Sequence, residues 1–210
     1  MKNHEYPRVL ETNLTKNSFV NIVKEEFNSN TILQNEEILN VTKDRFHFDC
    51  CIFKNMNFED CNFEHCDLLD VIFDHCDLSN VVFSESSIHR TSFISCRMIG
   101  SDFSNSLLNN VDFQNIQGDY INFSASTFKT SEFHNCSLEN ASYNACTFKD
   151  LLLHECNLNH DEFINTILNQ IDISTCSIDD ITISMDCIKG LKVSAEQAIL
   201  LSKTLGLIVV

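Results

Sequence analysis

The sequence contains two residue types that bind metals or act in catalysis, namely eleven cysteines and eight histidines. Structural zinc sites use cysteine and histidine ligands at short spacings, and the most specific of these is the Cys-x-x-Cys motif. This chain has no Cys-x-x-Cys motif. His65–Cys66 and His75–Cys76 are adjacent in sequence. In an extended chain, adjacent side chains diverge and do not form a nucleophile with its base. The spacing therefore argues against a metal centre or a cysteine nucleophile.

Other signatures of enzymes are also missing from the sequence. It contains no Gly-x-Ser-x-Gly motif, no P-loop and no Gly-x-Gly-x-x-Gly motif. Asp179–Asp180 is more typical of a solvated turn than of a catalytic pair. We therefore expect a protein without enzyme activity, metal or cofactor.

The cysteines belong to a wider pattern that repeats every five residues. From Phe48 to Val193, every fifth residue except Gly118 is large and apolar, and fourteen of the seventeen phenylalanines lie on this register. Nine of the cysteines lie two residues before such a position. Neither a helix nor a straight strand keeps every fifth residue on one face, so the chain must turn once per five residues and stack its coils into a solenoid. The inward cysteines are then expected to be small, buried and reduced.

The five-residue unit resembles the pentapeptide-repeat motif, A(D/N)LXX with a central Leu or Phe. Units such as CDLLD, CNFEH, CDLSN and CNLNH carry the resemblance, which covers residues 46–193. It implies an all-β solenoid, a right-handed quadrilateral β-helix with four units per coil. Four units per coil means that register residues twenty positions apart stack in one column. The sequence agrees, because two of the four columns are mainly aromatic and the columns between them carry smaller side chains.

The two ends of the chain differ from the repeats. Residues 1–45 keep the register poorly and are predicted to cap the first coil, with 18–27 as a short helix or an irregular strand. Residues 194–210 are predicted to form a helix, capped by Ser194 and Gln197 and ended by Gly206, followed by a short strand over 207–210. This segment has more apolar surface than a cap needs, so we predict a two-fold dimer contact. The expected contact residues are Ile199, Leu201, Leu205, Leu207, Ile208, Val209 and Val210.

The charge of the protein lies on the repeats. Residues 46–193 hold 22 acidic and 7 basic side chains, which gives −15 of the total net charge of −16. Seven or eight coils rising about 4.8 Å each span roughly 35 Å, so the rod carries about 0.4 charges per Å, against about 0.6 for duplex DNA. Direct binding to nucleic acid is therefore disfavoured.

The C-terminal segment GLKVSAEQAILLSKTLGLIVV resembles that of the Qnr and MfpA group of pentapeptide-repeat proteins. That resemblance implies an end-to-end homodimer that mimics DNA, binds DNA gyrase or topoisomerase IV, and modulates it or protects it against fluoroquinolones or gyrase toxins. The register is unbroken, so no projecting loop is expected. The acidic residues predicted to contact this partner are Glu59, Asp60, Glu64, Asp67, Asp70, Asp74, Asp77, Asp112, Glu132 and Asp172.

A second function remains open at this point, namely a structural or adaptor solenoid with an unrelated protein partner. Outward apolar residues such as Ile52 and Ile72, one coil apart, would suit an adaptor, whereas a duplex mimic should be polar along its sides. The sequence has no signal peptide and no apolar run long enough to span a membrane, so we expect a cytoplasmic protein without membrane contact.

Overall fold

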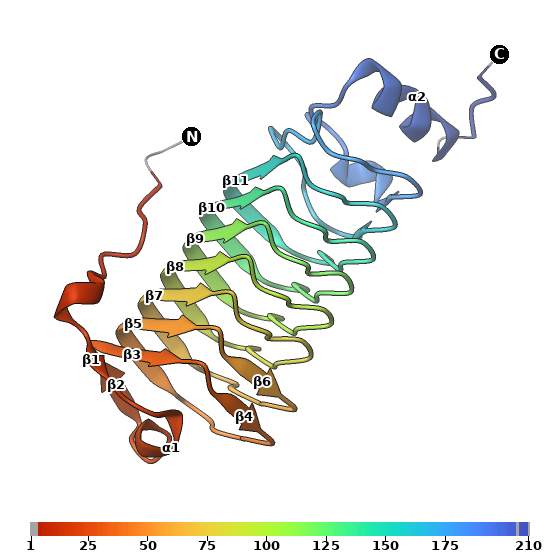
Figure 1. The fold of residues 1–210 in the computed structure, drawn as a ribbon. Coiled ribbons are helices and arrows are strands. Elements are labelled where there is room, and N and C mark those ends of the chain that lie inside the picture. The colour runs from red at the N-terminus through yellow and green to blue at the C-terminus, as the bar shows by residue number, and fades with distance from the viewer. Residues whose placement is uncertain (1–3, 205, 210) are drawn as a thin grey trace.

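The computed structural model describes residues 4–204 and 206–209 as a parallel β-solenoid of about eight coils with a short C-terminal helix (Figure 1). The main sheet has nine strands, of which six are long and cross two sides of each coil: β5 (His47–Lys54), β7 (Asp67–Asp74), β8 (Ser87–Ile94), β9 (Leu107–Gln114), β10 (Thr127–His134) and β11 (Thr147–His154). The other three strands of this sheet are β1 (Thr15–Lys16), β2 (Phe27–Ser29) and β3 (Thr31–Gln34). The remaining short strands are β4 (Glu37–Leu39), β6 (Asn57–Glu59), β12 (Glu162–Phe163) and β13 (Thr182–Ile183). The helices are the 3-10 turns η1 (Glu11–Asn13) and η2 (Met185–Cys187) and the α-helices α1 (Phe19–Ile22) and α2 (Ala195–Thr204). None of the described helices is long and apolar enough to cross a membrane.

Each coil contains twenty residues, as the columns predict. Phe53 pairs with Phe73 and Phe73 with Phe93, and isolated bridges such as Asn62↔Val82 keep the same offset on the short sides. Four five-residue units therefore complete one coil. The pairing starts upstream of residue 46, because β2 and β3 both pair with β5, so part of the expected N-terminal cap is itself coiled.

The corners of the coils explain the five-residue period. The backbone adopts a positive φ two residues after most inward positions, from Asn30 to Asp180. Eleven of these corner residues are Asn, which tolerates the left-handed region better than most residues because its short amide can bond locally. The turns therefore need few glycines.

The core is filled by the register residues. Phe53, Phe73 and Phe93 stack with ring centroids 4.7 and 5.0 Å apart, and Phe83 stacks on Phe103 at 5.0 Å on the facing wall. Rings of the two walls meet edge to face, as Phe93 and Phe103 do at 5.8 Å. The interior is thus a closely packed aromatic column, which confirms the predicted stacking.

At many coils, the position two residues before the register residue carries a Ser, Thr or Cys that donates a hydrogen bond, and at others it carries an apolar residue such as Val71 or Ile121. Ser106 Oγ donates to the Phe83 carbonyl at 3.0 Å, and Cys96 Sγ lies 3.5 Å from the Phe73 carbonyl. The same offset of 23 residues recurs along the rod. All eleven cysteines are free thiols, and nine of them are buried. The cysteines therefore serve the same packing position as the serines.

The N-terminal strap, residues 4–16, runs along the main sheet and crosses its long strands (Figure 1). Lys54 Nζ lies 2.8 Å from Glu11, and Arg8 N–H donates to Asp70 Oδ1 at 2.8 Å. Glu5 N–H donates to Asn110 Oδ1 at 2.9 Å, and His4 Nδ1 lies 2.8 Å from the Thr130 carbonyl. The strap therefore covers outward side chains over four coils, and it was not expected from the sequence.

Both ends of the rod are closed by short helices. Ser18 precedes α1 as predicted, but the Glu36 carboxylate accepts the Phe19 N–H at 2.9 Å in place of a Ser18 side-chain cap. At the other end, Ser194 and Gln197 form the predicted capping box, with bonds of 2.8 and 3.2 Å. Gly206 follows α2 with φ 75°, as expected. The predicted strand is wrong for 207–209, which are irregular because no neighbouring strand pairs with them in the described chain.

Candidate partner-binding surface

The outward acidic residues of two adjacent sides of the rod form one ridge. These sides are built from residues 57–60 and 62–65 and their repeats at intervals of twenty, between residues 57 and 185. The first side carries Glu59, Asp60, Asp77, Asp119, Glu139, Asp179 and Asp180, and the second carries Glu64, Glu85, Asp102 and Glu162. These eleven residues are the acidic ridge. Arg97 is the one lysine or arginine at these outward positions.

The acidic ridge is open to solvent along its length. All eleven carboxylates are exposed or half-buried in the structure. Arg97 Nη1 lies 3.0 Å from Asp77 Oδ2, so only one ridge carboxylate is paired with the ridge's single arginine. Between residues 57 and 185, no other lysine or arginine stands at the outward positions of these two sides, while Lys43 and Arg45 lie on the coil before the ridge.

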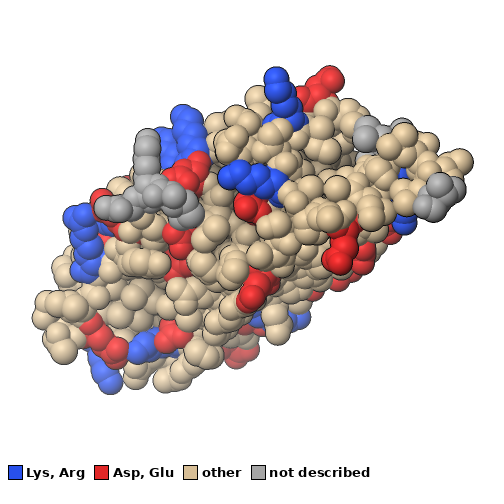
Figure 2. All heavy atoms as spheres, turned by 90° about the horizontal axis from the view of Figure 1, so that it is seen from above, with Lys and Arg blue, Asp and Glu red and all other residues tan. Residues whose placement is uncertain are grey.

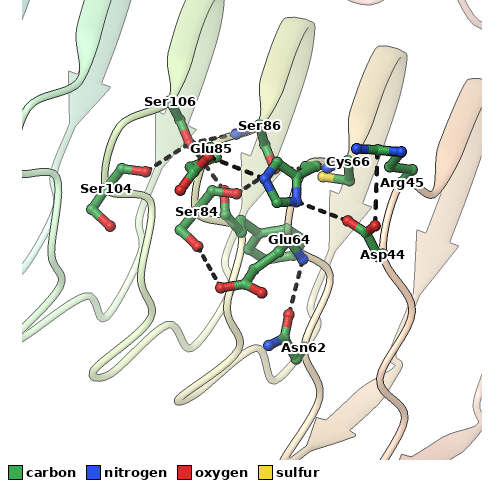
Figure 3. Close-up of polar contacts among 12 residues, drawn as sticks. Asp44, Arg45, Asn62, Glu64, Cys66, Ser84, Glu85, Ser86, Ser104 and Ser106 are labelled. Atoms are coloured by element: carbon green, nitrogen blue, oxygen red, sulfur yellow. Dashed lines mark hydrogen bonds and ion pairs between the residues drawn. The ribbon is translucent and has the colours of Figure 1, made fainter.

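Bonds between neighbouring coils fix the spacing of ridge side chains (Figure 3). Ser84 Oγ donates to Glu64 Oε1 at 3.2 Å, and the Glu64 N–H donates to Asn62 Oδ1 at 2.9 Å. His65 lies 2.8 Å from Asp44 and 3.0 Å from Glu85, and these two hydrogen bonds raise its pKa. The bonds from Ser84 and His65 to the neighbouring coils therefore hold Glu64 and Glu85 in place.

The other two sides carry a mixed charge. The remaining basic residues of the repeats lie on them: Lys54, Arg90, Lys129, Lys149, Lys189 and Lys192. Figure 2 shows one face of the molecule on which blue Lys and Arg side chains stand among red acidic ones. The net charge is therefore concentrated on the ridge sides and is not spread evenly around the rod.

The ten acidic residues expected to contact a partner do not share one surface. Four of them lie on the acidic ridge: Glu59, Asp60, Glu64 and Asp77. Asp67, Asp74 and Asp172 are half-buried or exposed on the other two sides. Outward residues twenty positions apart share one side of the rod, so the sequence itself separates the ridge residues from those on the other two sides.

Three of the ten are buried, so their assignment to an exposed contact surface is wrong. Arg90 lies 2.6 Å from Asp70, and Arg8 N–H donates to the same carboxylate. Burial opposes the ionisation of Asp70, but these hydrogen bonds outweigh it and lower its pKa. Asp112 and Glu132, 1% and 7% exposed, lie under the N-terminal strap. The repeat predicts exposure for all three residues because their positions point outward. They are buried because the strap, which the repeat does not encode, covers them.

The C-terminal tail exposes apolar side chains at the end of the rod. Ile199, Leu207, Ile208 and Val209 are 48–88% exposed. Leu201 is 7% exposed because it packs on the last coils as part of the cap, so it does not face a partner chain as expected. Leu205 and Val210 lie outside the described residues. The exposed residues keep the expected dimer contact as a prediction.

Two clusters of described residues bring potential metal ligands together. Asp49, Cys50 and Asp70 form the first, and Asp112, Glu132 and His134 form the second. In the first cluster, Arg90 and Arg8 already occupy the Asp70 carboxylate. The two clusters therefore differ in whether their charge is already balanced.

Comparison with known proteins agrees with the repeat. The family described as "Pentapeptide repeat region" matches residues 66–135. No curated protein sequence matches the chain. The structure of QnrB1, a plasmid-mediated fluoroquinolone resistance protein, is similar with a TM-score of 0.52 and 16% identity over 84% of this chain and 100% of that one. HetL from the cyanobacterium Nostoc, a pentapeptide-repeat protein involved in the regulation of heterocyst differentiation, gives a TM-score of 0.32 at 10% identity over 76% and 87% of the two chains.

Proposed function

We propose that this chain, a pentapeptide-repeat protein whose fold resembles that of QnrB1, binds DNA gyrase or topoisomerase IV through the acidic ridge in place of duplex DNA. The proposal assigns the chain a binding role without catalysis. Its consequence would be modulation of the topoisomerase or its protection against fluoroquinolones or gyrase toxins.

The charge density of the acidic ridge carries this proposal. The ridge holds eleven acidic residues and one basic residue over six coils, from Glu59 to Asp179–Asp180. Six coils rise about 29 Å at about 4.8 Å each, so the ridge carries about 0.3 net charges per Å. Duplex DNA carries about 0.6 negative charges per Å of its axis. A protein that contacts the duplex from one side faces roughly half of these charges. The two linear densities therefore agree for the side that a partner would contact.

A homodimer would extend this surface. The exposed residues Ile199, Leu207, Ile208 and Val209 lie at the C-terminal end of the rod, where a two-fold contact joins two rods end to end. An end-to-end dimer doubles the length of the ridge to about 60 Å, which is about 17 base pairs of duplex at 3.4 Å each. The dimer and the ridge therefore support the same partner class.

Two variants with equal charge change test the ridge. The ridge variant carries Glu59→Gln, Glu85→Gln, Glu139→Gln and Asp179→Asn, and the control variant carries Asp67→Asn, Asp74→Asn, Glu155→Gln and Asp172→Asn. Each removes four negative charges, so total charge is matched and only position differs. Both should melt like the parent, because exposed charges contribute little to stability.

The expected result is that the ridge variant loses most of its binding to the topoisomerase while the control variant retains it. Binding of the parent should weaken with salt and compete with linear duplex DNA. A supercoiling assay with and without ciprofloxacin then reports whether binding protects the enzyme. Equal binding by both variants, with no displacement by duplex DNA, would contradict the proposal.

The adaptor function has lost its main support. Ile52 is only 4% exposed, so it does not offer an apolar surface to a partner, and Ile72 is half-buried. An adaptor would bind its partner without competition from duplex DNA. The competition experiment therefore also separates these two functions.

A further inference from the structure

Two carboxylates under the strap are buried without a balancing cation. Asp112 and Glu132 lie one coil apart in the register of β9 and β10. Neither forms an ion pair with a lysine or arginine within the described chain, in contrast to Asp70 with Arg90. Buried carboxylates are costly unless they are paired or bind a metal ion. A bound cation would balance this charge in addition to the histidines that lie beside Glu132.

His134 completes a compact set of ligands with these two carboxylates. One potential ligand atom from each of Asp112, Glu132 and His134 lies within 4.8 Å of the others. His134 Nε2 is 3.0 Å from Glu132 Oε2, and Gln114 donates a hydrogen bond to Asp112 Oδ2. Asp112 Oδ1 is buried and has no hydrogen-bond partner. Asp112 is a member of the cluster, so this unpaired oxygen of its carboxylate is available to a cation.

His4 of the strap lies beside the cluster, against Glu132, but outside the group of three ligands, and one of its ring nitrogens has no partner. Its ring is 5% exposed, with Nδ1 2.8 Å from the Thr130 carbonyl and 3.7 Å from Glu132 Oε1. Since Nδ1 must carry the proton that bonds this carbonyl, Nε2 of the neutral ring carries a lone pair. His4 Nε2 is buried and has no hydrogen-bond partner. A histidine whose Nδ1–H bonds a backbone carbonyl is oriented as metal-binding histidines are.

We propose that Asp112, Glu132 and His134, closed over by His4, form a site for a divalent transition-metal ion such as Zn²⁺. Two carboxylates and one imidazole supply three oxygen and nitrogen ligands of the kinds zinc binds, which leaves the fourth position of a tetrahedral site open to water. Imidazole ligands favour Zn²⁺ over Mg²⁺ or Ca²⁺, which prefer sites built from oxygen alone. The ion would neutralise the buried carboxylates beneath the strap, where His4 packs against Glu132.

The second candidate cluster serves as an internal contrast. Asp70 already accepts hydrogen bonds from Arg90 and Arg8, so a cation beside it would meet the positive charge of the guanidinium. Asp49, Cys50 and Asp70 should therefore not hold the ion. A Cys50→Ser variant should bind zinc as the parent does.

Zinc titration of the untagged full-length protein by calorimetry, after removal of metals with a chelator, tests the site. We expect one equivalent to bind, and we expect His134→Ala to weaken zinc binding at least tenfold, because even residues behind metal ligands contribute about 10–100-fold. His154→Ala is the matched control, since His154 occupies the same position one coil along and lies outside the cluster. Both histidines are partly exposed, so both variants should fold.

The strap supplies a second readout. The Arg8 side chain is exposed but the backbone N–H of Arg8 is bonded to Asp70, so trypsin should cut after Arg8 faster when the strap lifts. Zinc at 100 times its dissociation constant should slow that cut by up to about 100-fold if lifting the strap releases the ion. His134→Ala should abolish the zinc effect, whereas His154→Ala and Cys50→Ser should keep it. Absence of zinc binding to the parent, or equal binding by His134→Ala, would overturn the proposal. Loss of zinc binding in Cys50→Ser would overturn it as well, because the ion would then occupy the other cluster. A zinc-binding protein that fails to bind a topoisomerase would leave this inference intact, since the ridge and this site lie on different sides of the rod.

Discussion

A buried carboxyl in the core column should make the stability of the rod depend on pH. Asp161 is 0% exposed and occupies the inward small-residue position between Ala141 and Ile181. Its Oδ1 accepts the Ala141 N–H at 2.8 Å, while its Oδ2 is buried without a hydrogen-bond partner. Burial raises the pKa of Asp161 from 3.8 to about 9, and the charges of Asp119 and Glu139 add to this effect. The folded protein therefore holds this carboxyl protonated at neutral pH.

The sign of the effect follows from the two states. Between pH 3.8 and about 9, the unfolded chain has lost this proton and the folded chain has kept it. Because the folded state binds more protons, the free energy of unfolding falls as pH rises through this window, by up to about 1.4 kcal/mol per pH unit. From pH 5 to pH 8 the loss from this one group reaches about 4 kcal/mol.

Asp161→Asn tests this reasoning because an amide keeps the acceptor oxygen and cannot ionise. We expect the variant to gain stability over the parent as pH rises, with a difference that grows by up to about 4 kcal/mol between pH 5 and pH 8. Urea unfolding at several pH values measures it. Asp172→Asn is the control, since hydrogen bonds from Ser174 lower the pKa of Asp172 and leave it ionised throughout this range. A difference between Asp161→Asn and the parent that stays constant within about 1 kcal/mol from pH 5 to 8 would refute the argument.

Three further predictions follow from the packing and the exposed ends. Phe103→Ala should lower the free energy of unfolding by about 3–5 kcal/mol, because Phe103 is fully buried between Phe83 and Phe123, whereas Ile167→Ala, at a position 69% exposed, should change it little. A thiol reagent should leave the nine buried cysteines unmodified until the protein unfolds, and it should modify Cys50 more slowly than its partial exposure implies, because burial and Asp49 raise the pKa of Cys50 to about 11. Rapid modification of more than two thiols in the native protein would contradict this. Ile208→Asp should convert the dimer into monomers in light scattering, because a charge in an apolar contact is costly, and a monomeric parent protein would end the dimer prediction.

The fold could be predicted because the repeat encodes it locally. Phe53, Phe73 and Phe93 lie twenty residues apart in sequence, and the structure stacks them directly. The Gly118 exception is also local, because Ile116 beside it is large and a Cβ on Gly118 would lie 3.2 Å from the Ile116 side chain. The capping box of Ser194 and Gln197 could also be predicted from the sequence, because it depends only on two residues three positions apart.

The candidate surface was only partly predictable because it depends on contacts outside the repeat. The strap places His4 beside Glu132, 128 positions away in sequence. The strap lies outside the five-residue repeat, so the sequence pattern does not predict which residues it contacts. Asp112 therefore points outward by the repeat and is buried by the strap. The ridge itself could be predicted from the sequence, because Glu59, Asp119 and Asp179 are separated by multiples of twenty residues and therefore share a column.

The small-residue column accounts for nine of the eleven cysteines as packing residues. Where the column is polar, a short side chain donates to the carbonyl 23 residues upstream, as Ser126 does to Phe103 and Cys136 to Phe113. Serine, threonine and cysteine all satisfy both conditions, so they are interchangeable there at little cost. Asp161 satisfies the length condition but must also keep a proton to remain neutral. Asp161 accepts the Ala141 N–H instead of donating to a carbonyl, so its carboxyl makes this position of the column sensitive to pH.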